Sequence, residues 1–191
     1  MVDSAYFDGL KKRVSAYESG RREVIKVAGD ALSASKRAIF AMHRDDLETA
    51  DGLLVEAGKI LGAVRERADA NRDLDDEGSY RAALEEYFEA RLYRQWLDGG
   101  NIGRLEGEPD DYRAYLGAVS DLTGEIQRRQ VRLATEGRVD EVRRLRDDIE
   151  AVVGQLLDMD LGGYLRTKFD QAKNNLRRAE DVLYDITLRK G

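Results

Sequence analysis

Four acidic residues near the middle of the sequence form two closely spaced pairs that can bind a metal ion. Glu86 and Glu89 lie in the segment SYRAALEEYFEARLYRQWL. Asp121 and Glu125 lie in the segment YLGAVSDLTGEIQRRQ. Spacings of three and four place both members of each pair on one helical face, and carboxylate oxygens are the ligands that Mg²⁺ and Mn²⁺ prefer. Two such pairs on two helices permit a four-carboxylate site, but the spacing alone is a weak signal in a chain with 38 acidic residues.

The first pair lies in a stripe of residues that has the helical period. The members of this stripe are Ala82, Glu86, Glu89, Tyr93 and Leu97. Burying two carboxylates against another helix costs desolvation unless a metal ion, an arginine or a shared proton compensates. The alternative is an exposed face on which the nonpolar members are only half-buried. Glu85 lies off the stripe, with Arg81 one turn before it, and is predicted to be a surface residue.

The second pair is followed by arginines and flanked by small residues. Arginine presents a fork of donors that suits phosphate, so the three that follow are candidates for nucleic-acid binding, with a surface or interface role as the alternative. These are Arg128, Arg129 and Arg132. The small residues around the acids allow another helix or a ligand to approach closely. These are Gly117, Ala118 and Gly124.

The elements that must position these residues are helices. Apolar residues recur at spacings of three and four, strand-like alternation is absent, and the chain has one proline, Pro109. The pattern predicts an all-α bundle, a single domain over residues 1–191, with six main helices and room for a short seventh near Asn101–Glu106. The first helix is predicted to run for roughly 40 residues, against a mean near 11–12. Breaks are predicted at 44–46, 71–78, 98–111, 136–138 and 158–163.

Composition limits the chemistry. The chain has 191 residues, a formal net charge of −6, no cysteine and one histidine, His43. Thiolate metal sites, cysteine nucleophiles and histidine-rich metal centres are excluded, and no apolar run approaches the roughly 20 residues that span a bilayer. With no signal-peptide pattern at its start, the protein is expected to be soluble and cytoplasmic. The negative net charge restricts any nucleic-acid site to a local basic patch.

Three segments carry a resemblance to a known family. ALEEYFEA, YLGAVSDLTGEIQR about 30 residues later, and the ending RRAEDVLYDITLRKG resemble the translin superfamily, specifically the archaeal type of its translin-associated factor X (TRAX) branch. The resemblance covers most of Glu77 to Gly191. It implies an all-α bundle of about seven helices that assembles into a homo-oligomer, commonly a hexamer or octamer. Translin itself binds single-stranded DNA and RNA, whereas the TRAX branch and archaeal relatives are Mg²⁺-dependent endoribonucleases.

The resemblance also implies roles for individual residues. The glutamates of the family's E-x-x-E motif fall on Glu86 and Glu89, the aspartate of D-L-T-G-E falls on Asp121, and Glu125 is a further possible ligand. These four are expected to hold Mg²⁺ or Mn²⁺ for cleavage of single-stranded RNA. The family's basic positions cannot be matched one by one, and residues 97–111 do not align.

Two other readings stay open. The first is a non-catalytic protein that binds single-stranded DNA or RNA, as translin does, in which the acids are structural. The second is a helical oligomer whose polar stripes are subunit interfaces, which the heptad pattern over Leu165–Ile186 suits.

Overall fold

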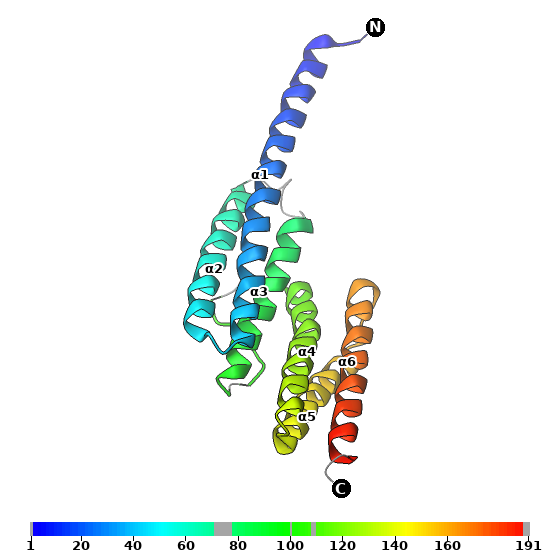
Figure 1. The fold of residues 1–191 in the computed structure, drawn as a ribbon. Helices are drawn as coiled ribbons and strands as arrows, with labels where there is room; N and C mark the ends of the chain where they lie inside the picture. The colour runs from blue at the N-terminus through cyan, green and yellow to red at the C-terminus, as the bar shows by residue number, and fades with distance from the viewer. Residues whose placement is uncertain (1, 71–77, 100, 108–109, 189–191) are drawn as a thin grey trace. The chain divides into compact units, whose positions relative to one another are not determined.

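The computed structural model describes residues 2–70, 78–99, 101–107 and 110–188, and these ranges contain six α-helices and no β-strand (Figure 1). The helices are α1 (Ser4–His43), α2 (Leu47–Ala70), α3 (Gly78–Leu97), α4 (Tyr112–Thr135), α5 (Val139–Leu157) and α6 (Gly163–Leu188). The predicted all-α class and the long first helix are confirmed. Residues 101–107 form a loop, so the short seventh helix predicted there is wrong.

Aspartate side chains cap helices that begin directly after two of the predicted breaks, 44–46 and 98–111. Oδ1 of Asp46 accepts a hydrogen bond of 3.2 Å from the backbone N–H of Thr49 in the first turn of α2. Oδ1 of Asp111 accepts bonds of 3.0 Å from the N–H groups of both Arg113 and Ala114 in α4. These bonds satisfy amides that have no partner within the helix, and they fix the start of the helix. None of the described helices is both long and apolar enough to cross a membrane.

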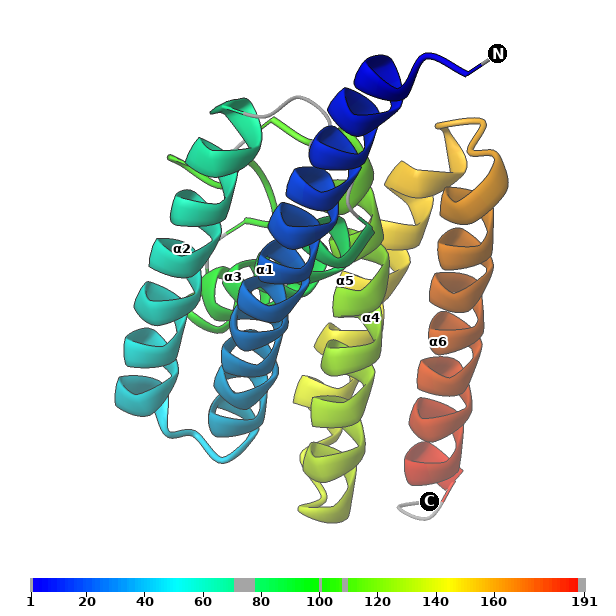
Figure 2. The ribbon, with the colours of Figure 1, turned by 90° about the horizontal axis from the view of Figure 1, so that it is seen from above.

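Contacts divide the chain into an N-terminal unit, residues 1–87, and a C-terminal unit, residues 88–191, with the boundary inside α3. In the N-terminal unit, α1 and α2 pack side by side as an antiparallel pair (Figures 1 and 2). The turn between them uses Asp45 in the left-handed region, at φ 59°. The first buried residue of α1 is Val24, which packs with Val64 of α2. The preceding half of α1 extends beyond α2 and is largely exposed.

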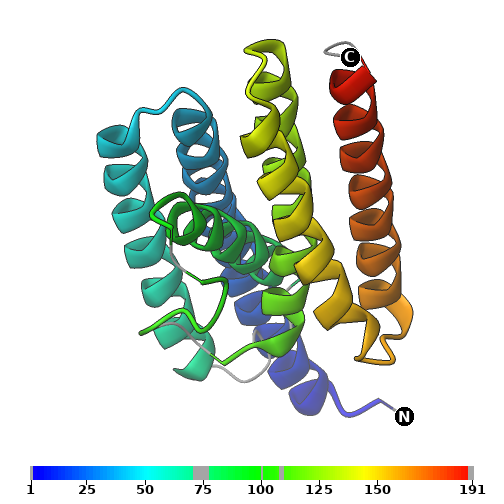
Figure 3. The same ribbon diagram turned by 90° about the horizontal axis from the view of Figure 1, so that it is seen from below.

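In the C-terminal unit, α4, α5 and α6 each contact the other two helices (Figure 3). Their apolar stripes form a shared core that includes Leu122, Ile126, Leu145, Ile149 and Phe169. One buried amide joins all three helices, because Nε2 of Gln130 in α4 donates to the carbonyls of Val142, at 3.0 Å, and Ala179, at 3.1 Å. This core positions α4, which carries the second acid pair. That the whole chain is one domain remains a prediction.

Candidate metal and nucleic-acid site

The two candidate glutamates of α3, Glu86 and Glu89, are largely shielded from solvent. Glu89 is 7% exposed, and the carboxylate of Glu86 lies with its Oε2 3.5 Å from Nζ of Lys36 in α1. Tyr93, in the same stripe, is fully buried, so the alternative of an exposed face is wrong. Glu86 belongs to the N-terminal unit and Glu89 to the C-terminal unit, three residues apart on one helix.

Glu85 is buried too, at 8% exposure, and its predicted surface position is wrong. The reason is that α3 is covered around most of its circumference. Ala83, Leu84 and Tyr93, which point in different directions around the helix, are all buried with it. A prediction from one apolar stripe assumes that the helix buries a single face. On a helix that is buried on several sides, residues beside that stripe are then wrongly predicted to be exposed.

Tyr93 connects the end of α3 to the arginines of α4. A guanidinium N–H of Arg129 donates to the Tyr93 hydroxyl, and the charges of Glu125 and Arg132 also act on it. The Tyr93 ring stacks on Trp96, with centroids 5.8 Å apart and planes at 13°. Burial raises the pKa of Tyr93 to about 12, against a smaller lowering by Arg129. The hydroxyl is therefore neutral near pH 7 and serves as a buried hydrogen-bond partner.

Asp121 of α4 is held by a lysine that the sequence analysis did not identify. Nζ of Lys168 in α6 forms an ion pair and hydrogen bond with Oδ2 of Asp121. The Asp121 side chain is 27% exposed and the Lys168 side chain 15%, so water screens the pair only partly. Lys168 also lies 5.4 Å from the ring centroid of Tyr164. No local signal in the sequence points to Lys168, because it is 47 residues from Asp121 and the packing of α4 on α6 brings it near.

The arginines after the second pair have partners within the chain. Nη1 of Arg128 lies 4.0 Å from Oε2 of Glu125, and Nε of Arg132 lies 3.9 Å from Oε1 of Glu136. Arg128 is the most exposed of the three, whereas Arg129 and Arg132 are partly buried. Arg128 is therefore the best placed of the three to reach a phosphate in solution.

The small residues beside the acids accommodate a helix. A Cβ at Gly124 would lie 3.4 Å from Nδ2 of Asn175 in α6, and that nitrogen donates to Oγ1 of Thr123 at 2.9 Å. Of the two partners that the sequence allowed here, a helix or a ligand, α6 is the one that approaches at Gly124.

The candidate metal ligands have oxygen donors that suit Mg²⁺ or Mn²⁺, and two of them are bound to cations. Within the described ranges, no three acidic or histidine side chains are placed to hold one metal ion. Instead, Glu86 pairs with Lys36, and Asp121 pairs with Lys168. The donor set fits a hard divalent cation by its chemistry.

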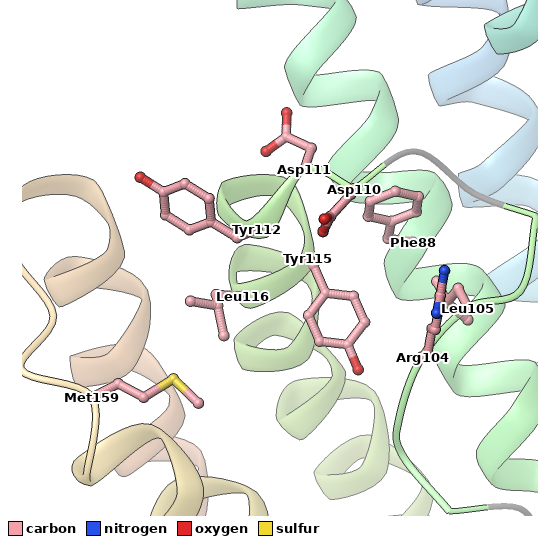
Figure 4. Close-up of a pocket in the computed structure, with 9 residues that line it drawn as sticks. All are labelled: Phe88, Arg104, Leu105, Asp110, Asp111, Tyr112, Tyr115, Leu116 and Met159. Carbon is pink, nitrogen blue, oxygen red and sulfur yellow. The ribbon is translucent and has the colours of Figure 1, made fainter.

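A pocket of about 560 Å³ lies at the start of α4 in the C-terminal unit (Figure 4). Its lining is mostly apolar and aromatic, and it includes none of the four candidate carboxylates. The lining residues are Phe88, Arg104, Leu105, Asp110, Asp111, Tyr112, Tyr115, Leu116 and Met159. The Tyr115 hydroxyl donates to the carbonyl of Gly103 at 2.7 Å, which ties the loop to α4. No signal in the sequence indicates this pocket, because residues 97–111 carry no motif.

Comparison with known proteins gives the chain a family and a fold. The sequence model of the Translin family matches residues 19–190, a range that runs through both units. No curated protein matches the chain.

Three solved structures are similar in fold. Apo-NeC3PO has a TM-score of 0.85 at 22% identity, covering 97% of this chain and 98% of that chain. A complex of AfC3PO with duplex RNA has a TM-score of 0.81 at 21% identity, covering 96% and 97%. AfC3PO in a further crystal structure has a TM-score of 0.81 at 22% identity, covering 96% and 98%. At these identities the likeness confirms the fold.

Proposed function

Because the chain belongs to the translin family, we propose that it is a metal-dependent endoribonuclease of the archaeal TRAX-like type that cleaves single-stranded RNA. The observation that carries this proposal is the intact E-x-x-E pair on α3, whose carboxylates are shielded from solvent and include one bound to a lysine. Carboxylates that are removed from water lose solvation free energy unless a cation binds to them. The similarity to AfC3PO, which has been solved with duplex RNA, supports a nucleic-acid ligand.

Glu86, Glu89, Asp121 and Glu125 are the proposed ligands of Mg²⁺ or Mn²⁺. When bound, such an ion is a Lewis acid that activates water and offsets negative charge on phosphate oxygens. Hydrolysis forms a bond between a water oxygen and phosphorus and breaks one phosphodiester P–O bond, and the leaving oxygen takes up a proton.

The cationic side chains supply the rest of the proposed site. Lys36 and Lys168 neutralise Glu86 and Asp121 in the absence of metal. Arg128 is proposed to contact substrate phosphates. Arg129 and Arg132 are proposed to do the same when their contacts with Tyr93 and Glu136 break. We expect the active form to be a homo-oligomer, a hexamer or octamer, in the cytoplasm.

The second candidate function is non-catalytic binding of single-stranded DNA or RNA. The observation that favours it is the engagement of Glu86 and Asp121 by lysines, which by itself satisfies both charges without a metal. In that case Mg²⁺ has no effect on RNA binding and no strand is cut.

The test is cleavage of an end-labelled single-stranded RNA by the full chain with Mg²⁺ and with EDTA. We expect cleavage only with metal, and its abolition in Glu86→Gln and Glu89→Gln. Glu85→Gln is the matched control, since Glu85 is a neighbouring glutamate that is as buried as Glu89 but is not a proposed ligand. A duplex RNA of the same sequence measures strand preference. Binding without cleavage under all conditions would establish the second function, and cleavage unaffected by EDTA would rule out the metal site.

A further inference from the structure

A basic hollow with one aromatic wall lies between the end of α1 and the start of α2, within the N-terminal unit. Its volume is about 400 Å³. Three cationic side chains and an exposed ring surround a small apolar floor. The residues are Lys36, Arg37, Phe40 and Arg44, with Ala41 and Leu53 beneath them. No motif in the sequence marks these residues.

Phe40 is 51% exposed, and the guanidinium carbon of Arg44 lies 5.0 Å from its ring centroid. A single exposed aromatic residue is ordinary on a protein surface. Here, however, the ring borders a hollow and is paired with a guanidinium plane. Aromatic rings and arginine planes are the surfaces on which unpaired bases of RNA stack. In a duplex the faces of the bases are covered by their neighbours, so this arrangement favours a single strand.

The cations lie on both sides of the ring along α1. Lys36 and Arg37 precede Phe40 by about one helical turn, and Arg44 follows it by about one turn. A nucleotide stacked on the ring would therefore have a cation near the phosphate on each side. Asp46, two residues after Arg44, caps α2, and its negative charge partly offsets the local positive charge. Base stacking should therefore contribute to affinity as much as charge does.

The hollow also adjoins one candidate carboxylate, that of Glu86, through Lys36. This lysine lines the hollow, and its Nζ lies 3.5 Å from Oε2 of Glu86. We propose that the hollow binds one nucleotide of a single-stranded RNA, with the base stacked on Phe40 and the phosphates bound by Arg37 and Arg44. The inference rests on the proposed function, since it places substrate beside Glu86, and it deepens that function by naming a substrate-binding subsite.

The test measures RNA binding in EDTA, so that cleavage does not interfere. Fluorescence anisotropy of a short labelled oligoadenylate is compared with that of an abasic strand of equal length and charge. Phe40→Ala should weaken oligoadenylate binding by about tenfold, as expected for one lost base stack, and leave the abasic strand unaffected. Phe40→Trp should retain affinity. Arg37→Gln and Arg44→Gln should weaken both strands by about threefold to tenfold and reduce the salt dependence of binding.

The controls lie outside the hollow. Tyr184 of α6 is 65% exposed, and Arg22 is an exposed arginine of α1 more than ten residues before Lys36. Tyr184→Ala and Arg22→Gln should bind both strands as the wild type does, with assembly checked by light scattering.

The outcomes separate this inference from the proposed function. If the wild type binds oligoadenylate and the hollow variants bind it equally well, the subsite is wrong and the nuclease proposal is unaffected. If Phe40→Ala weakens both strands equally, or Tyr184→Ala has the same effect, stacking on Phe40 is wrong. If the variants behave as expected but no RNA is ever cleaved, the subsite stands and the nuclease is wrong. A wild type that binds no RNA overturns both.

Discussion

At the scale of single residues, the candidate carboxylates are defined by the cations that they contact. Asp121 and Lys168 form a partly shielded ion pair between α4 and α6. A pair that is partly removed from water interacts more strongly than a surface pair, and loss of one partner leaves the other charge poorly solvated. The lysine partners therefore stabilise the ionised form of these carboxylates.

We expect Lys168→Met to destabilise the protein by about 1–2 kcal/mol, because Asp121 keeps its charge and loses its ammonium partner. Chemical denaturation at pH 7 measures this change. The matched control is Lys173→Met on the same helix, whose ammonium lies 2.8 Å from Asp170 in an exposed pair. Lys173→Met should destabilise the protein less than Lys168→Met does, because its pair is exposed to water. Equal losses for the two variants would show that shielding adds nothing at Lys168.

The buried Tyr93 hydroxyl makes the free energy of unfolding depend on pH in the alkaline range. Burial raises the pKa of Tyr93 from 10.0 to about 12, so above pH 10 the unfolded chain ionises this phenol before the folded chain does. Its contribution is complete below pH 10 and declines between pH 10 and pH 12, by at most about 1.4 kcal/mol per pH unit.

Denaturation at several alkaline pH values tests this dependence. The slope of unfolding free energy against pH should be less steep in Tyr93→Phe than in the wild type. Tyr184→Phe, at an exposed position of α6, should leave the slope unchanged. Parallel slopes in all three proteins would contradict the burial of Tyr93.

At the scale of elements, helix positions could be predicted from the sequence, while helix coverage could not. Apolar spacing and helix breaks are local signals, and they correctly predicted the long α1 and the starts of α2 and α4. The burial of Glu85 depends on how many neighbours surround α3, and the partner of Asp121 comes from α6. Both follow from contacts between residues distant in sequence. The E-x-x-E spacing could name Glu86 and Glu89, but it carries no information about Lys36.

Two glycines of α2 differ only in what lies beside them. A Cβ at Gly58 would lie 2.7 Å from the hydroxyl oxygen of Tyr87, whereas nothing lies within 4 Å at Gly62. Alanine is the better helix former, so Gly62→Ala should stabilise the protein by about 0.5–1 kcal/mol. Gly58→Ala should give no gain or a loss, because the buried Tyr87 ring must shift. Thermal unfolding of both variants measures the difference, and equal gains would mean that α3 does not pack closely on α2.

At the scale of the whole molecule, charge and exposed apolar surface both bear on assembly and binding. The net charge of −6 opposes general attraction to nucleic acid, so binding depends on local clusters such as that around Phe40. The exposed half of α1 carries several apolar side chains, including Tyr6, Phe7 and Val14. Exposed apolar side chains that gather on one element are typical of a surface that another subunit covers.

We expect the protein to be a hexamer or octamer, with a mass six or eight times the 21.6 kDa of one chain. Light scattering and native mass spectrometry measure this mass. Val14→Glu, which places a charge on the exposed stripe, should lower the mass without unfolding the chain. Val55→Glu, at an equally exposed position of α2, is the control. A monomeric wild type would contradict the prediction.

The extension of α1 also determines how fast its amides exchange with deuterium. A helix of 40 residues is about 60 Å long, and its buried residues begin at Val24, with Tyr17 partly buried beside them. In an isolated chain, protection should therefore fall steeply toward Ser4, since an unsupported helical half opens by local fraying. In an assembly that covers this half, protection should extend along the whole helix. The exchange profile of α1 thus measures how much of its stability comes from other subunits.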